Sequence, residues 1–241
     1  MILEERAYIK MKFSKRMDLF GESIFTTLAN MRSERKKQGL EVIDLSIGAP
    51  NIPPTQEVME TIAKEAMKPE NYLYAIQDAV DLQNTVKEWY ERRYGVVIDP
   101  TTELTTLLGS QDGLAHLALT LVDEGDTVLV QDPCYPIFRD GPLLAGAHVV
   151  TMPLLKENDY LIDFDMIDEK TAQDAKYMIV SYPNNPTCGV ANDEFYKKLI
   201  VFAKKYNIVV LHDNAYSELL FEGPGHSFLE FEGAKDVGIE F

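Results

Sequence analysis

The feature that most restricts the fold is a regular alternation of short apolar runs and helical patterns, which extends from Glu103 to Phe241. Short apolar runs bounded by polar turns are typical of buried strands, whereas apolar residues that recur every three or four positions are typical of helices. The expected strands are Leu104–Leu108, Asp126–Val130, His148–Met152, Lys176–Val180, Ile208–Leu211 and Val237–Phe241. The expected helices are Leu114–Val122, Tyr135–Ala145, Phe164–Lys170 and Asn192–Tyr206. This order predicts an α/β fold with a mainly parallel sheet that carries helices on both faces.

The part of the chain before Glu103 has a different pattern, in which helices predominate. Met1–Phe20 has a mixed composition and is expected to form an arm. The expected helices are Glu22–Lys37, Thr55–Lys68 and Ala79–Tyr94, and Val42–Ile47 is expected to be a short strand. The composition changes most sharply near Val97–Thr102, but this boundary is not expected to separate independent domains.

Composition excludes several classes of partner. The chain has 241 residues and a net charge of −16, which argues against binding to nucleic acid or to anionic membrane surfaces. Two cysteines, Cys134 and Cys188, are too few for a disulfide framework, so a reducing, cytoplasmic setting is expected. The start of the chain is charged and has no apolar signal core, and no apolar run approaches transmembrane length.

Polar side chains follow two of the expected strands. The segment SYPNNPTCGV, from Ser181 to Val190, places Asn185 after one strand, and the segment HDNAY, from His212 to Tyr216, follows the next strand along the chain. Ligands of open α/β sheets bind at the carboxyl ends of the strands. An Asn, an Asp and a Tyr are therefore predicted to meet at one edge of the sheet, where they could form a binding site.

These two segments resemble the corresponding segments of the class I and II aminotransferases, enzymes that use pyridoxal phosphate. The resemblance extends from about Ile43 to Phe241, and the sequence is similar in particular to the LL-diaminopimelate/aspartate-type aminotransferases of bacteria. It implies that residues 1–47 form an N-terminal arm and a segment of a small domain. Residues 48–241 would form a large cofactor-binding domain that is incomplete at the C-terminus. One departure is Cys188, which occupies a position that is usually glycine in the family.

The resemblance implies catalytic roles for three residues. Asp213 would face the ring nitrogen of the cofactor, and a carboxylate there favours a protonated pyridinium that can accept electrons from a carbanion. Asn185 and Tyr216 would bind the phenolic oxygen of the ring. An Asn in a turn before proline and an Asp at a strand end are frequently only structural, but the combination on neighbouring strands is much less common.

The resemblance also assigns residues to the rest of the cofactor and to the substrate. Ser110 and Gln111 would bind the cofactor phosphate at a helix start, Tyr135 would stack on the ring, and Gly48 would meet the substrate carboxylate. Tyr74, with Tyr72 as the alternative, matches a tyrosine that reaches the phosphate from a partner subunit. This match implies a homodimer with shared active sites. Without the resemblance, a Gly-containing turn and an aromatic residue at a helix start would indicate only local structure.

The family's Schiff-base lysine has no counterpart in this sequence. The chain resembles about the first three-fifths of an aminotransferase, and Lys235 precedes the last strand and is expected to be a solvated loop residue. The predicted reaction of the complete enzyme is amino-group transfer between an α-amino acid and a 2-oxo acid, and the chain alone is expected to be inactive. Carbon–sulfur β-elimination and decarboxylation on the same fold remain open, as does a non-catalytic fragment or interaction module. The four histidines show no metal-ligand spacing.

Overall fold

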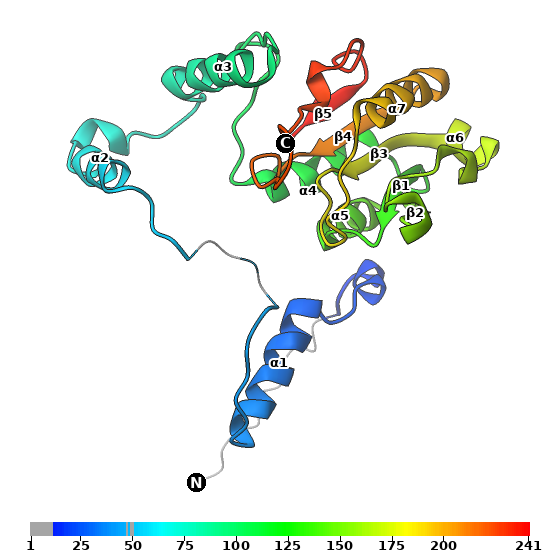
Figure 1. Cartoon of the computed structure of the whole chain (residues 1–241), viewed down its shortest axis with the longest axis horizontal. Helices are drawn as coiled ribbons and strands as arrows, with labels where there is room; N and C mark the ends of the chain where they lie inside the picture. Colours follow the sequence, from blue (N-terminus) through cyan, green and yellow to red (C-terminus); the bar gives the residue numbers. More distant parts are fainter. Residues whose placement is uncertain (1–11, 47, 49–50) are drawn as a thin grey trace. The chain divides into compact units, whose positions relative to one another are not determined.

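The computed structural model describes residues 12–46, 48 and 51–241 (Figure 1). The chain divides into two compact units, Met1–Gln77 and Asp78–Phe241. The predicted boundary between residues 47 and 48 rests on the family resemblance and stays a prediction.

The first unit consists of short helices. A 3-10 helix, η1, covers Lys15–Leu19, the helices α1 and α2 cover Ile24–Lys37 and Gln56–Ala66, and a second 3-10 helix, η2, covers Pro69–Tyr72. The expected strand Val42–Ile47 is wrong over residues 42–46, which are neither helix nor strand, and Ile47 lies outside the described residues. A strand requires a partner for its ladder of hydrogen bonds, and the described part of this unit contains no other strand. Ile43 and Leu45 are accordingly exposed.

The second unit is built on a five-stranded sheet with the strand order β2-β1-β3-β4-β5. The strands are β1 (Thr127–Asp132), β2 (His148–Pro153), β3 (Ala175–Ser181), β4 (Val209–Asp213) and β5 (Gly238–Glu240). Each pair of neighbours is parallel. The predicted parallel sheet is therefore confirmed, and its carboxyl edges all lie on one side.

Helices cover both faces of this sheet, as the sequence predicts. The helices of this unit are α3 (Val80–Tyr94), α4 (Ser110–Leu121), α5 (Pro136–Ala145), α6 (Glu169–Asp174) and α7 (Asp193–Tyr206), with 3-10 helices η3 (Lys156–Asn158), η4 (Phe164–Met166) and η5 (Phe228–Glu230). Alternate strand residues point to opposite faces. Met178 and Val180 pack with α7, whereas Tyr177 and Ile179 pack with α4 and α5. The expected N-cap Asn192 accepts a hydrogen bond from the Phe195 backbone N–H, 2.9 Å away.

Two expected elements differ from the structure. Leu104–Leu108 is not a strand, because the carboxylate of Asp78 accepts hydrogen bonds from the backbone N–H and the hydroxyl of Thr106. Among the described strands, β5 pairs only with β4, and a groove of about 420 Å³ lies between β5 and residues 102–105. The expected helix Phe164–Lys170 is divided into η4 and α6. Asp168 causes this division, because its side chain caps α6 by accepting from the Thr171 backbone N–H.

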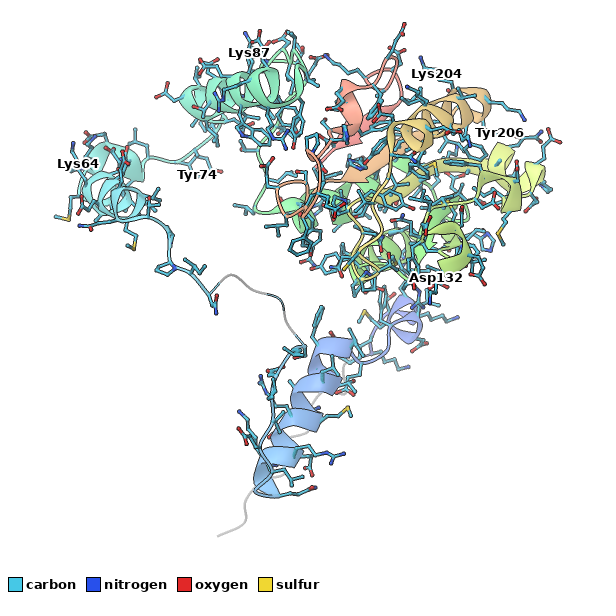
Figure 2. The ribbon with its side chains drawn as sticks, viewed as in Figure 1. Lys64, Tyr74, Lys87, Asp132, Lys204 and Tyr206 are labelled. Carbon is cyan, nitrogen blue, oxygen red and sulfur yellow. The ribbon has the colours of Figure 1, made fainter. Side chains whose placement is uncertain are left out.

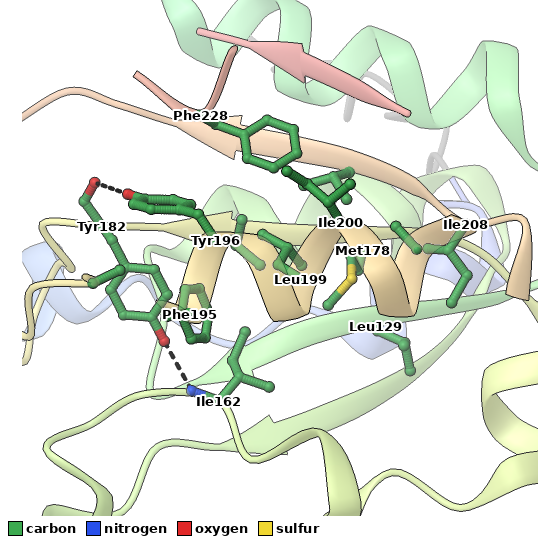
Figure 3. Close-up of a cluster of buried hydrophobic side chains, with 14 of the residues drawn as sticks. Leu129, Ile162, Met178, Tyr182, Phe195, Tyr196, Leu199, Ile200, Ile208 and Phe228 are labelled. Carbon is green, nitrogen blue, oxygen red and sulfur yellow. Dashed lines mark hydrogen bonds between the residues drawn. The ribbon is translucent and has the colours of Figure 1, made fainter. Parts of the chain in front are cut away.

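The larger hydrophobic core lies between the sheet and α7 (Figure 3). Leu199 is completely buried there, next to strand residues such as Met178, whereas Val201 on the same helix is 68% exposed. We expect Leu199→Ala to lower the free energy of unfolding by about 2–5 kcal/mol, because it removes buried apolar contacts and leaves a cavity. Val201→Ala is the matched control and should change it by less than about 0.5 kcal/mol. Urea denaturation measures both, and equal effects would contradict this assignment of the core.

Candidate active site

Three neighbouring strands bring the predicted site residues to one edge of the sheet. In the ladder between β3 and β4, Ser181 lies opposite Asp213, so the two strands end together. β1 lies on the other side of β3 and ends at Asp132 (Figure 2). The segments that follow these three ends carry Tyr135, Asn185 and Tyr216. The grouping of Asn185, Asp213 and Tyr216 that the alternation predicts is therefore present at the level of the backbone.

Asn185 and Tyr216 are in direct contact, since the Asn185 side-chain amide donates a hydrogen bond to the Tyr216 hydroxyl oxygen at 3.2 Å. The turn that carries Asn185 is held by the preceding Asn184, whose side-chain oxygen accepts from the Thr187 backbone N–H at 3.1 Å. Cys188 closes this turn with a φ of 60°. Glycine is the residue that most readily adopts this left-handed conformation, which gives a physical reason for the family's glycine at this position.

Asp213 is nearly buried, with 7% of its surface exposed. Its Oδ1 atom has no hydrogen-bond partner among the described residues. Burial raises the pKa of the Asp213 carboxyl group, while the charge of His212 and a hydrogen bond from the Ala215 backbone N–H act to lower it. A buried carboxylate oxygen without a donor is costly, and a cationic N–H group placed against it would satisfy it.

A cavity of about 690 Å³ lies beside Asn185 and Tyr216. Asn185 and Tyr216 line it together with Cys188, residues 219–221 supply an apolar wall, and the charged Glu222 lies beside them. Of the described residues that line this cavity, none is a lysine. Lys235 lies elsewhere in the unit, where its ammonium group donates to the Glu103 carboxylate at 2.8 Å and to the Val97 carbonyl at 3.0 Å.

The amino end of α4 lies at the same edge. The end of α4 is followed directly by β1, so the helix runs opposite to the strands and its first turn lies at their carboxyl ends. A Cβ atom added at Gly113 would be 2.6 Å from the Phe241 ring, which places this turn beside the end of β5. The helix begins at Ser110, earlier than expected, and Ser110 and Gln111 are therefore exposed residues of its first turn.

Backbone N–H groups in such a turn attract anions, and Gly109, at the N-cap, has no side chain to occupy them. Asp112 lies in the same turn, and its negative charge opposes an anion. Its carboxylate is 2.8 Å from His116 Nδ1 and accepts from the Leu108 backbone N–H at 3.3 Å.

Tyr135 is partly exposed and immediately precedes α5. Its ring forms a T-shaped pair with Phe138, with the centroids 6.0 Å apart and an angle of 83° between the ring planes. The stacking role of Tyr135 stays a prediction.

Two predicted site residues belong to the other unit. Gly48 is exposed, and Tyr74 is 90% exposed (Figure 2). The alternative residue, Tyr72, donates a hydrogen bond to the Ala66 carbonyl at 2.6 Å. The assignments of Gly48 and Tyr74 therefore stay predictions.

Sequence reasoning missed polar groups that support the site from inside the sheet. Gln131 is fully buried in β1, and its side-chain oxygen accepts from the Ser181 backbone N–H at 2.8 Å. The same oxygen accepts from the Asn184 amide at 3.3 Å, so Gln131 connects β1 to the turn that carries Asn185. The only local signal was a polar residue within an apolar strand.

The chain is similar to known proteins over most of its length. The family "Aminotransferase class I and II" matches residues 41–237. The chain belongs to this family. The LL-diaminopimelate aminotransferase of Aquifex aeolicus is 42% identical over 233 residues, which are 95% of this chain and 60% of that protein. The corresponding enzyme of Dehalococcoides mccartyi strain 195 is also 42% identical, over 96% of this chain and 60% of its own length.

Solved structures of other proteins have the same fold. The apo structure of BacF from Bacillus subtilis has a TM-score of 0.88 and 36% identity, and covers 95% of this chain and 59% of its own. A probable N-succinyldiaminopimelate aminotransferase from Thermus thermophilus has a TM-score of 0.85 at 32% identity, over 90% of this chain and 59% of its own. The chain thus spans about three-fifths of the length of the relatives that it matches.

The family uses pyridoxal phosphate, and the residues at this edge fit that group. The orphaned Asp213 oxygen suits a protonated ring nitrogen, the Asn185–Tyr216 pair suits a phenolic oxygen, and the first turn of α4 suits a phosphate. In the described part of the chain, no three His, Cys, Asp or Glu side chains are grouped for metal binding. No helix there has the length and apolar character needed to cross a bilayer.

Proposed function

We propose that this edge of the sheet serves amino-group transfer between an α-amino acid and a 2-oxo acid, with pyridoxal phosphate as cofactor. The observation that carries the proposal is the buried Asp213 oxygen without a donor, at the same edge of the sheet as the Asn185–Tyr216 pair. When bound, the cofactor supplies an electron sink that stabilises negative charge on the substrate α-carbon.

Each residue at the edge then has a defined task. Asp213 holds a proton at the ring nitrogen, and Asn185 and Tyr216 bind the phenolic oxygen. Tyr135 fixes the plane of the ring, and Ser110 and Gln111 bind the phosphate at the first turn of α4. Gly48 is assigned to the substrate carboxylate on the basis of the family resemblance.

We propose LL-diaminopimelate as the amino donor, because relatives named for that activity are 42% identical to this chain. A chimera in which this chain replaces the matching 233 residues of the Aquifex aeolicus protein tests the proposal. With LL-diaminopimelate and 2-oxoglutarate, it should form glutamate. Release of pyruvate and ammonia from an amino acid would support β-elimination, and an inactive but folded chimera that fails to bind the cofactor would refute the assigned site.

We expect Tyr216→Phe to weaken binding of pyridoxal phosphate to the 241-residue chain by about tenfold or less, the loss expected for one hydrogen bond. An absorbance titration with the cofactor measures the effect. Tyr206→Phe is the matched control, because Tyr206 ends α7 and so lies near the amino end of β4, whereas the site lies at the carboxyl end (Figure 2). Equal affinities of wild type and Tyr216→Phe for pyridoxal phosphate would show that the Tyr216 hydroxyl does not bind the cofactor.

We further propose that the active enzyme is a homodimer in which Tyr74 contributes to the partner's phosphate site. In the chimera, we expect Tyr74→Phe to weaken cofactor retention. Mixing chimeras that carry Tyr74→Phe and Asp213→Asn should restore part of the activity, because one site of each hybrid dimer would contain neither change. Absence of restoration in verified hybrid dimers would contradict the shared site.

A further inference from the structure

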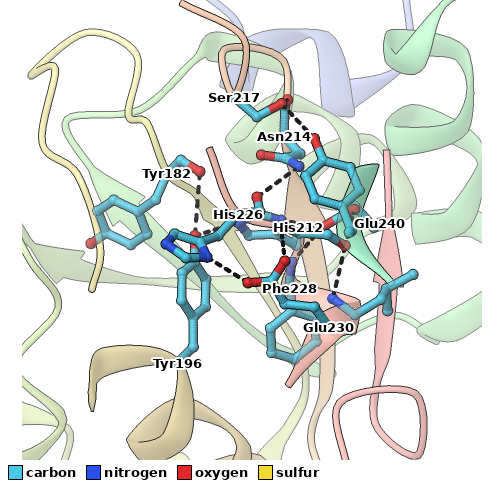
Figure 4. Close-up of polar contacts among 12 residues, drawn as sticks. Tyr182, Tyr196, His212, Asn214, Ser217, His226, Phe228, Glu230 and Glu240 are labelled. Atoms are coloured by element: carbon cyan, nitrogen blue, oxygen red, sulfur yellow. Dashed lines mark hydrogen bonds and ion pairs between the residues drawn. The ribbon is translucent and has the colours of Figure 1, made fainter. Parts of the chain in front are cut away.

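A buried carboxylate, that of Glu240 in β5, lies beside β4, where Glu240 is paired with His212. The side chain of Glu240 is completely inaccessible to solvent, although the residue belongs to the edge strand β5. Four donors surround it: His212 Nδ1 at 2.9 Å, the Ser227 hydroxyl at 2.6 Å, the Phe228 backbone N–H at 2.7 Å and the Tyr90 hydroxyl at 2.9 Å (Figure 4). Each carboxylate oxygen accepts from two of them, so neither needs a proton of its own.

This arrangement favours the ionised form of Glu240. Burial acts to raise the pKa of its carboxyl group, but the hydrogen bond and charge of His212, together with the hydrogen bonds from Ser227 and Phe228, lower it below its usual value. A buried anion of this kind requires a nearby positive charge, and His212 is the basic group in contact with it.

The second nitrogen of His212 also has a partner. Its Nε2 is 3.3 Å from the hydroxyl oxygen of Tyr196, and that hydroxyl is 3.4 Å from the Tyr182 carbonyl (Figures 3 and 4). A carbonyl oxygen can only accept, so the single Tyr196 proton satisfies it when the hydroxyl oxygen accepts from Nε2–H. Both ring nitrogens then donate, and the imidazole carries a positive charge.

His212 is adjacent to Asp213 in β4, and the two side chains leave opposite faces of the sheet. The Asp213 carboxylate receives a hydrogen bond from the Ala215 backbone, and His212 is the charged group that acts on it favourably. Other titratable groups around the pair are Tyr196 from α7, Tyr90 and Tyr94 from α3, and Glu230 and His226 beside η5.

We propose that Glu240 and His212 form a buried positioning pair for Asp213. Glu240 holds the imidazolium ring in place and joins β4, β5, α3 and the segment before η5. The imidazolium keeps the neighbouring carboxylate negative, as it must be to receive a protonated ring nitrogen. This last role rests on the function proposed above, whereas the charged state of the pair does not.

Nuclear magnetic resonance of the 241-residue chain labelled with [¹⁵N]histidine tests the charged state without cofactor. The chain has four histidines, and the His212 signals are identified by their loss in His212→Gln. At pH 8, we expect His212 to show two protonated nitrogens, because Nδ1 faces the Glu240 carboxylate and Nε2 faces the Tyr196 hydroxyl oxygen. A neutral His212 ring in the wild type at this pH would overturn the proposal. This outcome does not depend on whether a variant folds.

The isosteric Glu240→Gln variant tests the role of the carboxylate. We expect its His212 to become neutral at pH 8 and its affinity for pyridoxal phosphate to fall by about tenfold. The control is Glu230→Gln, which removes the carboxylate that contacts His226 at 2.5 Å and should leave His212 charged. A folded Glu240→Gln protein with a charged His212 would overturn the proposal. If wild type shows the charged ring but the folded chimera binds no cofactor, the pair stands and the proposed function fails.

Discussion

We expect Asp213→Asn to weaken binding of pyridoxal phosphate by about a hundredfold and to reduce transfer in the chimera by several orders of magnitude. The amide has no negative charge to hold a proton at the ring nitrogen, so the cofactor loses most of its capacity as an electron sink. The cofactor titration and the glutamate assay measure the two effects. Asp132→Asn, an exposed carboxylate at the end of β1, is the matched control and should bind the cofactor normally.

The same substitution should stabilise the protein in the absence of cofactor. Burial raises the pKa of Asp213 above its ordinary value of 3.8, so the folded state holds this proton more tightly than the unfolded chain. Wild type therefore loses stability as the pH rises from about 3.8 through the raised pKa, and the loss persists at neutral pH. At pH 7, Asp213→Asn should therefore raise the free energy of unfolding, by about 0.5–2 kcal/mol as is typical of a single stabilising substitution, in urea denaturation. Reduced stability together with normal cofactor affinity would contradict both roles.

Glu240→Ala should destabilise the protein strongly, lowering the free energy of unfolding by about 3–5 kcal/mol. It leaves the buried His212 without its partner and removes the acceptor of the Ser227, Phe228 and Tyr90 donors. A contrasting control is Glu218→Ala, which breaks the exposed 2.8 Å pair with Arg93 and should change stability by less than about 1 kcal/mol. Similar losses in the two variants would show that burial of the Glu240 pair has no special importance.

The pH dependence of the free energy of unfolding distinguishes the contribution of Glu240 from that of Asp213. The folded-state pKa of Glu240 lies below its ordinary value of 4.5, so its contribution is complete above pH 4.5 and is lost as the pH falls through the lowered pKa. Asp213 has the opposite sign. The fall in wild-type stability at acid pH should therefore be smaller in Glu240→Ala and steeper in Asp213→Asn. Urea denaturation at several pH values between about 3 and 7 compares the three proteins.

The sequence by itself determined the parallel α/β architecture of the second unit and the grouping of Asn185, Asp213 and Tyr216. Both follow from local patterns: apolar runs alternate with helical periodicity, and the carboxyl ends of parallel strands necessarily meet at one edge. The N-cap at Asn192 was likewise predictable, because the capping hydrogen bond spans only three residues.

Tertiary structure alone decided which expected strands pair with another strand and which polar groups form hydrogen bonds. Residues 104–108 have the composition of a strand, but a strand forms only against another strand, and Asp78 takes the Thr106 hydrogen bonds instead. Nothing local indicates that Glu240 meets His212, 28 residues earlier, or Tyr90, 150 residues earlier. The unpaired oxygen of Asp213 is equally invisible in the sequence. Burial and hydrogen-bond partners depend on how distant segments pack, whereas periodicity records only which side of its own element a residue occupies.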